Sequence, residues 1–168
     1  MRVLSAAAFV ALWVALGAAS AHGVHGHGLH HALGPYPVAQ TDFGIAGHPR
    51  KLSRTVLVDM REDLRFAPDT VRVKQGDTLR FVLHNSDRVR HEWVLGDRAE
   101  IERQAAARRA NAAALPEQVH ALHVDPGQTE EVVWTFNRVG TFQFACVTPG
   151  HREGGMVGSV TVMPAAPR

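Results

Sequence analysis

The chain has 168 residues, a formal net charge of +2 and one cysteine. The small net charge argues against nucleic acid as a partner, and one cysteine excludes an internal disulfide. The length is sufficient for one ordinary domain with its own hydrophobic core, preceded by a tail.

Residues 1–21 have the composition of an export signal. Arg2 gives a basic start, residues 3–18 are almost wholly apolar, and Ala19-Ser20-Ala21 is typical of a signal cleavage site. The apolar run is short for a membrane span and polar sequence follows it at once, so a retained membrane anchor is the weaker alternative. We therefore expect a periplasmic protein with no membrane attachment after cleavage.

A histidine-rich tract follows the predicted cleavage site. Glycines between its histidines disfavour regular structure, and such tracts bind metals. We expect an auxiliary copper or zinc site here, with a purely solubilising tail as the alternative. The candidate ligands are His22, His25, His27, His30 and His31. Residues 32–50 contain several prolines and glycines, so residues 22–50 are predicted to form a flexible tail and linker.

Residues 51–168 are predicted to form an all-β domain. Short segments rich in β-branched and aromatic residues alternate between apolar and polar positions, and turn residues separate them. This pattern is typical of a β-sandwich. The predicted strands span residues 54–60, 70–74, 78–84, 91–95, 130–136, 141–146 and 157–163.

One segment, residues 97–116, interrupts the strand pattern. Asp97 and Glu100 have the spacing of a helix capping box, and an alanine- and arginine-rich run continues to Leu115 before Pro116 ends it. The segment contains no His, Cys or Met, so it predicts a short helical insertion without copper ligands. The sequence leaves open whether this helix covers the sandwich or meets a partner.

A metal-binding loop is predicted between the last two strands. His151 and Met156 follow Cys146 within a stretch of eleven residues, with Pro-Gly and Gly-Gly turns between them. Cys146 shares its strand parity with Phe142 and Phe144, so its sulfur is expected to point into the core. Cys, His and Met suit copper in both of its oxidation states. A buried free cysteine beside a surface histidine is the alternative, but it leaves this clustering unexplained.

A blue-copper site needs a second histidine, delivered by a distant strand. His91 follows a polar loop and opens an apolar strand. It shares one face of that strand with Trp93 and Leu95, so it can point towards the core end where Cys146 arrives. We therefore assign His91 as the fourth ligand.

The remaining histidines are weaker candidates. His48 lies in the predicted linker, and His84 has the opposite parity to the apolar residues of its strand, which predicts a position on the sheet surface. His120 and His123 precede a turn and are expected at the surface. A second, weaker metal site formed by these two residues is the alternative.

Two segments of the chain resemble the cupredoxin family of type 1 (blue) copper proteins. They are Asn-Ser-Asp-Arg-Val-Arg-His-Glu-Trp-Val-Leu at 85–95 and Phe-Ala-Cys-Val-Thr-Pro-Gly-His-Arg-Glu-Gly-Gly-Met-Val-Gly at 144–158. Four residues separate the cysteine from the histidine, and four separate the histidine from the methionine. This spacing is similar to that of auracyanin-like proteins and of periplasmic cupredoxins of bacterial copper tolerance. The resemblance covers about residues 54–163.

The resemblance implies a Greek-key β-sandwich with one type 1 copper bound by His91, Cys146, His151 and Met156. It implies a role in copper tolerance, by binding copper and cycling it between Cu(I) and Cu(II), which the histidine-rich tail and the helical insertion favour. A soluble one-electron carrier with a periplasmic redox protein as partner is the alternative. An enzyme is disfavoured, because the fourth ligand is present and no acid–base group is evident beside the loop.

Charged residues lie beside both predicted histidine ligands. Arg88, Arg90 and Arg152 would create a positive electrostatic field that favours an anionic partner. Glu92 and Glu153 weaken this field.

Overall fold

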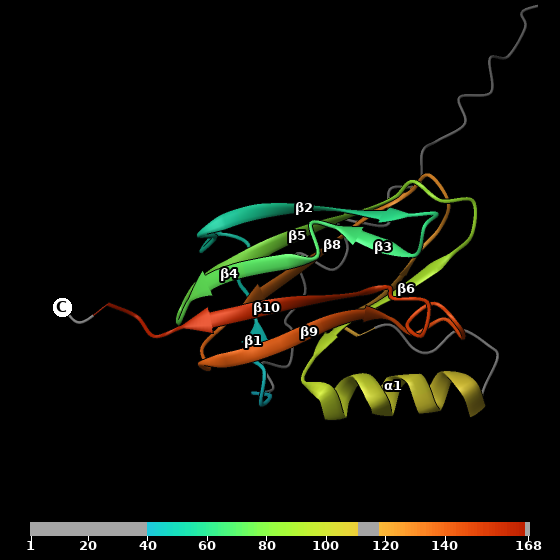
Figure 1. Cartoon of the computed structure of the whole chain (residues 1–168). Helices are drawn as coiled ribbons and strands as arrows, with labels where there is room; N and C mark the ends of the chain where they lie inside the picture. The colour runs from blue at the N-terminus through green and yellow to red at the C-terminus, as the bar shows by residue number, and fades with distance from the viewer. Residues whose placement is uncertain (1–39, 111–117, 167–168) are drawn as a thin grey trace, which may run out of the picture.

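Two β-sheets pack face to face, and one helix lies outside them (Figure 1). A computed structural model of the chain describes residues 40–110 and 118–166. The strands are β1 (Ile45–Ala46), β2 (Arg54–Arg61), β3 (Arg65–Ala67), β4 (Thr70–Lys74), β5 (Thr78–Asn85), β6 (His91–Gly96), β7 (Ala121–Val124), β8 (Thr129–Thr135), β9 (Gly140–Cys146) and β10 (Val157–Met163), and the helix is α1 (Arg98–Ala110). The strand orders are β1-β8-β5-β2-β3 and β4-β10-β9-β6-β7.

Both sheets mix parallel and antiparallel pairs. β5 is parallel to β2 and antiparallel to β8, while β10 is parallel to β4 and antiparallel to β9. Parallel neighbours cannot be joined by a tight hairpin, so the chain crosses between the sheets, as it does in a Greek-key sandwich. The predicted all-β sandwich with one helical insertion is therefore confirmed.

All seven predicted strands are present, each within one residue of its expected bounds. Three strands were missed: β1, β3 and β7 have only two, three and four residues. Segments this short carry too few residues for an alternating pattern to be recognised.

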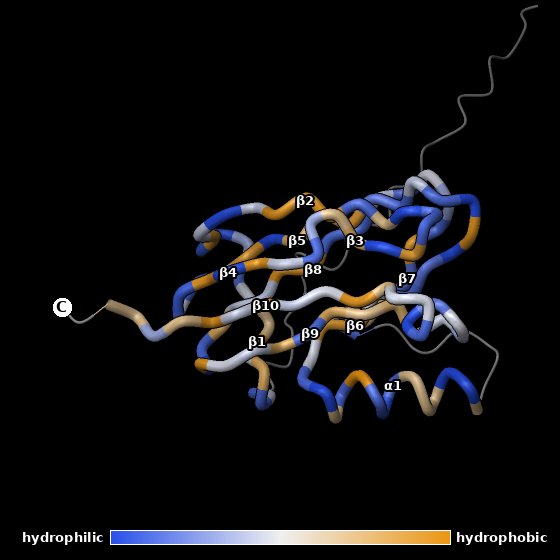
Figure 2. The backbone as a smooth tube through the Cα atoms, viewed as in Figure 1, coloured by the Kyte–Doolittle hydropathy of each residue, from blue (hydrophilic) through white to orange (hydrophobic). Residues whose placement is uncertain are grey.

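The core between the sheets contains a cluster of aromatic rings at its centre. Trp93 stacks on Phe144 with ring centroids 4.4 Å apart, and Phe66 meets both rings edge-on at 5.3 Å and 5.1 Å. Aromatic pairs in such arrangements contribute about 0.5–1.5 kcal/mol beyond the burial of their area. Hydrophobic and hydrophilic positions succeed one another along several of the strands, as Figure 2 shows. The rings provide a rigid support for Cys146, which is two residues beyond Phe144.

The helix α1 covers the outer face of the second sheet, which has the strand order β4-β10-β9-β6-β7. Ile101 and Ala105 pack against Val94, Ala145 and Val147. All six residues of β6 are buried, because one face of the strand meets the core and the other meets α1. Of the two roles that the sequence left open for the insertion, covering the sandwich is the one that the structure displays.

The predicted start of the helix is confirmed by its cap. The backbone N–H of Glu100 donates to Asp97 Oδ1 at 2.7 Å, which satisfies one of the free donors of the first turn. The predicted C-terminal end at Leu115 lies outside the described residues. Within the described ranges, no helix has the length and apolarity needed to cross a membrane.

The sandwich includes residues before position 51, where the domain was predicted to begin. Phe43 is 4% exposed and stacks on Trp134, whose Nε1–H donates to the Phe43 carbonyl at 3.1 Å. β1 pairs with β8. The described part of the segment, residues 40–50, therefore packs on the sandwich, which corrects the expectation of a linker there. The predicted signal peptide and histidine-rich tract lie outside the described residues.

Candidate metal centre

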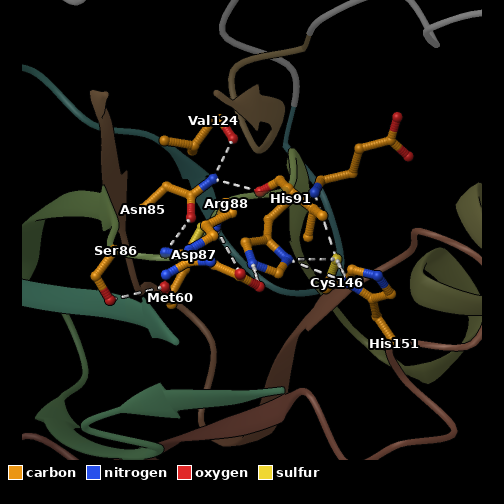
Figure 3. A network of polar contacts seen from close by, with 11 residues as sticks. Met60, Asn85, Ser86, Asp87, Arg88, His91, Val124, Cys146 and His151 are labelled. Atoms are coloured by element: carbon orange, nitrogen blue, oxygen red, sulfur yellow. Dashed lines mark hydrogen bonds and ion pairs between the residues drawn. The ribbon is translucent and has the colours of Figure 1, made fainter. Parts of the chain in front are cut away.

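Three of the four predicted ligands converge at one end of the sandwich (Figure 3). Cys146 Sγ lies 3.7 Å from His91 Nδ1 and 3.6 Å from His151 Nδ1, and the two Nδ1 atoms are 3.1 Å apart. In the described part of the chain, no other group of three or more His, Cys, Asp or Glu residues is arranged to hold a metal ion.

The pairing of β6 with β9 brings the first two of these residues together. The strands are antiparallel and Trp93 lies opposite Cys146, so the start of β6 and the end of β9 are at the same end of the sheet. His91 is two residues before Trp93 and therefore points to the same face. Both His91 and Cys146 are fully buried.

The third residue comes from the loop between β9 and β10. The N–H of Cys146 donates to the Met156 carbonyl at 3.1 Å, and the N–H of Met156 donates to the His151 carbonyl at 3.0 Å. Gly150 and Gly155 have φ angles of +85° and +105°, which residues with a side chain rarely adopt. Both predicted turns are therefore present, and they place half-buried His151 beside Cys146.

His91, Cys146 and His151 form a trio, and backbone hydrogen bonds join Met156 to two of its members. The side chain of Met156 is fully buried in the same core cluster as Cys146. The side chains of Met156 and Cys146 therefore face one core. The role of the thioether as the axial ligand stays a prediction.

The separations between the donor atoms suit a shared metal ion. Typical first-row metal bonds of about 2.3 Å to thiolate sulfur and about 2.0 Å to imidazole nitrogen place the donors of a trigonal set about 3.5–3.8 Å apart. The two sulfur–nitrogen distances fall in this range, and the nitrogen–nitrogen distance of 3.1 Å is slightly shorter. One soft thiolate and two imidazoles form the donor set that favours copper.

The protonation states of the metal-free site follow from its burial. Burial raises the pKa of the Cys146 thiol, against the opposing effect of hydrogen bonds from Thr148 and from the Glu92 backbone. Burial also lowers the pKa of His91 and of His151. Near neutral pH the site therefore holds a thiol and two neutral imidazoles, and metal loading must displace the thiol proton.

The Cys146 sulfur is fully buried, and it accepts hydrogen bonds from Thr148 and from the backbone of Glu92. The N–H of Glu92 points at Cys146 Sγ, with the nitrogen 3.4 Å from the sulfur. Trp93 and Phe144 belong to the core cluster that contains Cys146, whereas Val147 packs in the cluster beneath α1. Hydrogen bonding and burial of a ligand are the two means by which a protein tunes the electronic properties of a copper site.

Asp87 is a functional residue that the sequence reasoning missed. Its Oδ2 lies 3.1 Å from His91 Nε2, and its side chain is only 10% exposed. In Figure 3 the His91 ring lies between the Asp87 carboxylate and the pair formed by Cys146 and His151. A carboxylate that accepts the Nε2 proton leaves the Nδ1 lone pair facing the site, which is the tautomer that a metal ligand needs.

Asn85 fixes the loop that carries Asp87. Its Oδ1 accepts from the N–H of Asp87 at 2.9 Å, and its Nδ2 donates to the carbonyls of Val89 and Val124 at 2.8 Å and 2.9 Å. The Asn-Ser-Asp triplet was visible in the sequence. However, such residues are typical of any turn, so the triplet gave no signal for a contact with a ligand.

We expect Asp87→Ala to weaken Cu(II) binding by about ten- to a hundredfold, because the outer partner of a histidine ligand fixes its tautomer and ring orientation. Competition with a chelator of known affinity measures the effect. Asp63→Ala is the matched control, because Asp63 is half-exposed and pairs with Arg61. Equal affinities for the two variants would contradict a role of Asp87 at the site.

The other described histidines lie outside the trio. His48 is exposed, and so is His84, as predicted from its position in the strand. His120 Nε2 lies 2.9 Å from Glu100 Oε1, and its ring contacts Phe43 edge-on. Because these contacts occupy the His120 ring, the alternative of a second site formed by His120 and His123 gains no support.

The charges beside the ligands are largely paired. Arg90 pairs with Asp125, and Arg152 with Glu102. Glu92 is buried and pairs with Arg108 of α1, so it does not act as a surface charge. The positive electrostatic field beside the two histidines is therefore weaker than the sequence suggested.

A β-sandwich that gathers one cysteine and two histidines at one end defines the class of the cupredoxins. Residues 54–163 match the family of copper binding proteins described as the plastocyanin/azurin family. The chain belongs to this family and is therefore a copper-binding cupredoxin, with one type 1 copper as its cofactor.

Individual relatives agree with this assignment. The chain is 42% identical over 148 residues to the copper-resistant cuproprotein CopI of Rubrivivax gelatinosus, covering 86% of this chain and 87% of that protein. It is 30% identical to CopI of Pseudomonas aeruginosa, covering 73% of this chain and 83% of the relative. The solved structure of auracyanin B aligns with a TM-score of 0.60 and 27% identity, over 75% of this chain and 100% of that one.

Proposed function

We propose that this protein is a periplasmic cupredoxin that contributes to copper tolerance by binding copper and cycling it between Cu(I) and Cu(II). The observation that carries the proposal is the trio of Cys146, His91 and His151, whose donor atoms lie 3.1–3.7 Å apart. The similarity to two proteins named as copper-resistant cuproproteins supports tolerance as the physiological role.

The proposed ligands are the three residues of the trio, with Met156 as the axial ligand. Bound copper would supply one-electron exchange between its +1 and +2 states. The protein holds the ligands in one arrangement: Asp87 fixes the ring of His91, and the Glu92 N–H donates to the Cys146 sulfur. Because buried side chains and backbone bonds hold this arrangement, little of it needs to move when an electron passes.

The predicted histidine-rich tract adds a second copper-binding element to the proposal. Its five histidines would take up copper or zinc ahead of the sandwich in the chain. A predicted signal peptide at residues 1–21 supports export to the periplasm.

A soluble one-electron carrier is the second candidate, and the exposure of His151 favours it. His91 is fully buried, whereas His151 is half-buried in a loop and is the ligand nearer to solvent. A redox partner protein would therefore exchange electrons through His151. Neither role is enzymatic, in keeping with a predicted set of four ligands that leaves no open position for a substrate.

Deleting the gene is expected to sensitise the host to copper. Growth is measured over a copper series in the deletion strain, complemented with the wild-type gene or with the Cys146→Ser variant. Restoration by the wild-type gene alone is the expected result. Normal copper tolerance together with impaired respiration or photosynthesis would overturn the tolerance role and select the electron carrier. Turnover of a small substrate by the copper-loaded protein would overturn both.

A further inference from the structure

We propose that α1 is a clamp that restrains both histidine-bearing segments of the copper site through two ion pairs. The proposal rests on the ligand set proposed above. It gives the helical insertion a role beyond covering the sheet, because each ion pair attaches to the residue that directly follows a histidine of the trio.

The first ion pair joins α1 to the start of β6. Arg108 Nε donates to Glu92 Oε2 at 2.7 Å, and the two side chains are 17% and 9% exposed. Glu92 follows His91, and its backbone N–H donates to the Cys146 sulfur. An ion pair this well shielded from water is held more tightly than a surface pair, because breaking it leaves a buried charge uncompensated.

The second ion pair joins α1 to the loop between β9 and β10. Arg152 Nη2 lies 3.0 Å from Glu102 Oε1, with side chains 25% and 46% exposed. Arg152 follows His151, which comes from the loop rather than from a strand. This pair therefore connects the least anchored residue of the trio to the helix.

The helix is a firm base for both attachments. Ile101 and Ala105 pack on the second sheet, and Glu100 binds His120 at 2.9 Å. Glu102 and Arg108 are six residues apart, or about 9 Å along the helix axis. Two attachments separated in this way restrain the loop relative to β6, so that His151 stays close to His91 and Cys146.

Hydrogen exchange of the copper-free protein tests the clamp without reference to metal. The partly exposed Arg152–Glu102 pair is the one to alter, because its variants are expected to fold. Arg152→Glu or Glu102→Arg places like charges together. Each is expected to speed exchange of the Met156 amide about fivefold, near the upper end of what a partly exposed ion pair contributes. The double variant, which restores an opposite pair in swapped order, is expected to return the exchange rate towards that of the wild type.

The matched control is Arg103→Glu, which disrupts an ion pair with Glu100 within α1 and does not reach the ligand loop. It is expected to leave the exchange of Met156 unchanged. The clamp is overturned if the single variants exchange like this control, or if the double variant exchanges as fast as the single ones.

The rate of copper release to a chelator is measured in the same set of variants. It is expected to rise in the single variants and to recover in the double variant. A wild-type protein that shows no thiolate-to-copper absorption band would overturn the proposed ligand set. The hydrogen exchange of the copper-free variants would still decide the clamp, so the two failures are distinguishable.

Discussion

Cys146→Ser is expected to abolish the intense thiolate-to-copper absorption band of the Cu(II)-loaded protein. The band requires a thiolate ligand, and Cys146 is the only cysteine of the chain. A serine hydroxyl is neither soft nor readily deprotonated, so it cannot replace the thiolate at a blue-copper site. The visible spectrum of the purified protein, recorded beside that of the variant after loading with Cu(II), measures the effect.

The control for this experiment is a variant in which the five tail histidines are replaced by alanine. It is expected to keep the band and to bind less copper per chain, because the tail ligands are predicted to act separately from the site in the sandwich. A pale wild-type spectrum that does not change in Cys146→Ser would contradict the ligand assignment. Copper would then be held by the tail, and the sandwich site would need another explanation.

Phe144→Ala is expected to lower the free energy of unfolding of the copper-free protein by about 3–5 kcal/mol, the usual loss when a buried phenylalanine is truncated. Phe144 is fully buried, stacks on Trp93 and meets Phe66 edge-on. Truncation removes these contacts and leaves a cavity two residues before Cys146. Urea denaturation at equilibrium, followed by far-UV circular dichroism, measures the change.

Gln143→Ala is the matched control, because it truncates an exposed neighbour in the same strand. Its effect is expected to stay within about 0.5 kcal/mol, as for most surface substitutions. If Phe144→Ala lowered the free energy of unfolding by no more than this control does, the aromatic cluster would not be the support of the site. Because a ligand that binds only the folded state adds stability, the copper-loaded variant should recover part of the loss.

The sequence by itself determined the strands of the sandwich and the ligand-bearing loop. Alternation of apolar and polar residues is a property of neighbouring positions, so it is readable wherever a strand is long enough. The same holds for Cys146, His151 and Met156, because they lie within eleven residues and strand parity predicts which way the cysteine points. His91 was found by a similar argument, from its place at the start of an apolar strand.

Only the tertiary structure determined the contacts that surround and support the site. Trp134 meets Phe43 across 91 positions of the chain, and Arg152 meets Glu102 across 50. Glu92 was expected to weaken the positive field beside the ligands, but α1 buries it against Arg108. The carboxylate of Asp87 reaches His91 because Asn85 shapes the loop between them. Local patterns carry no information on such pairs, because which charge meets which depends on how separate elements pack together.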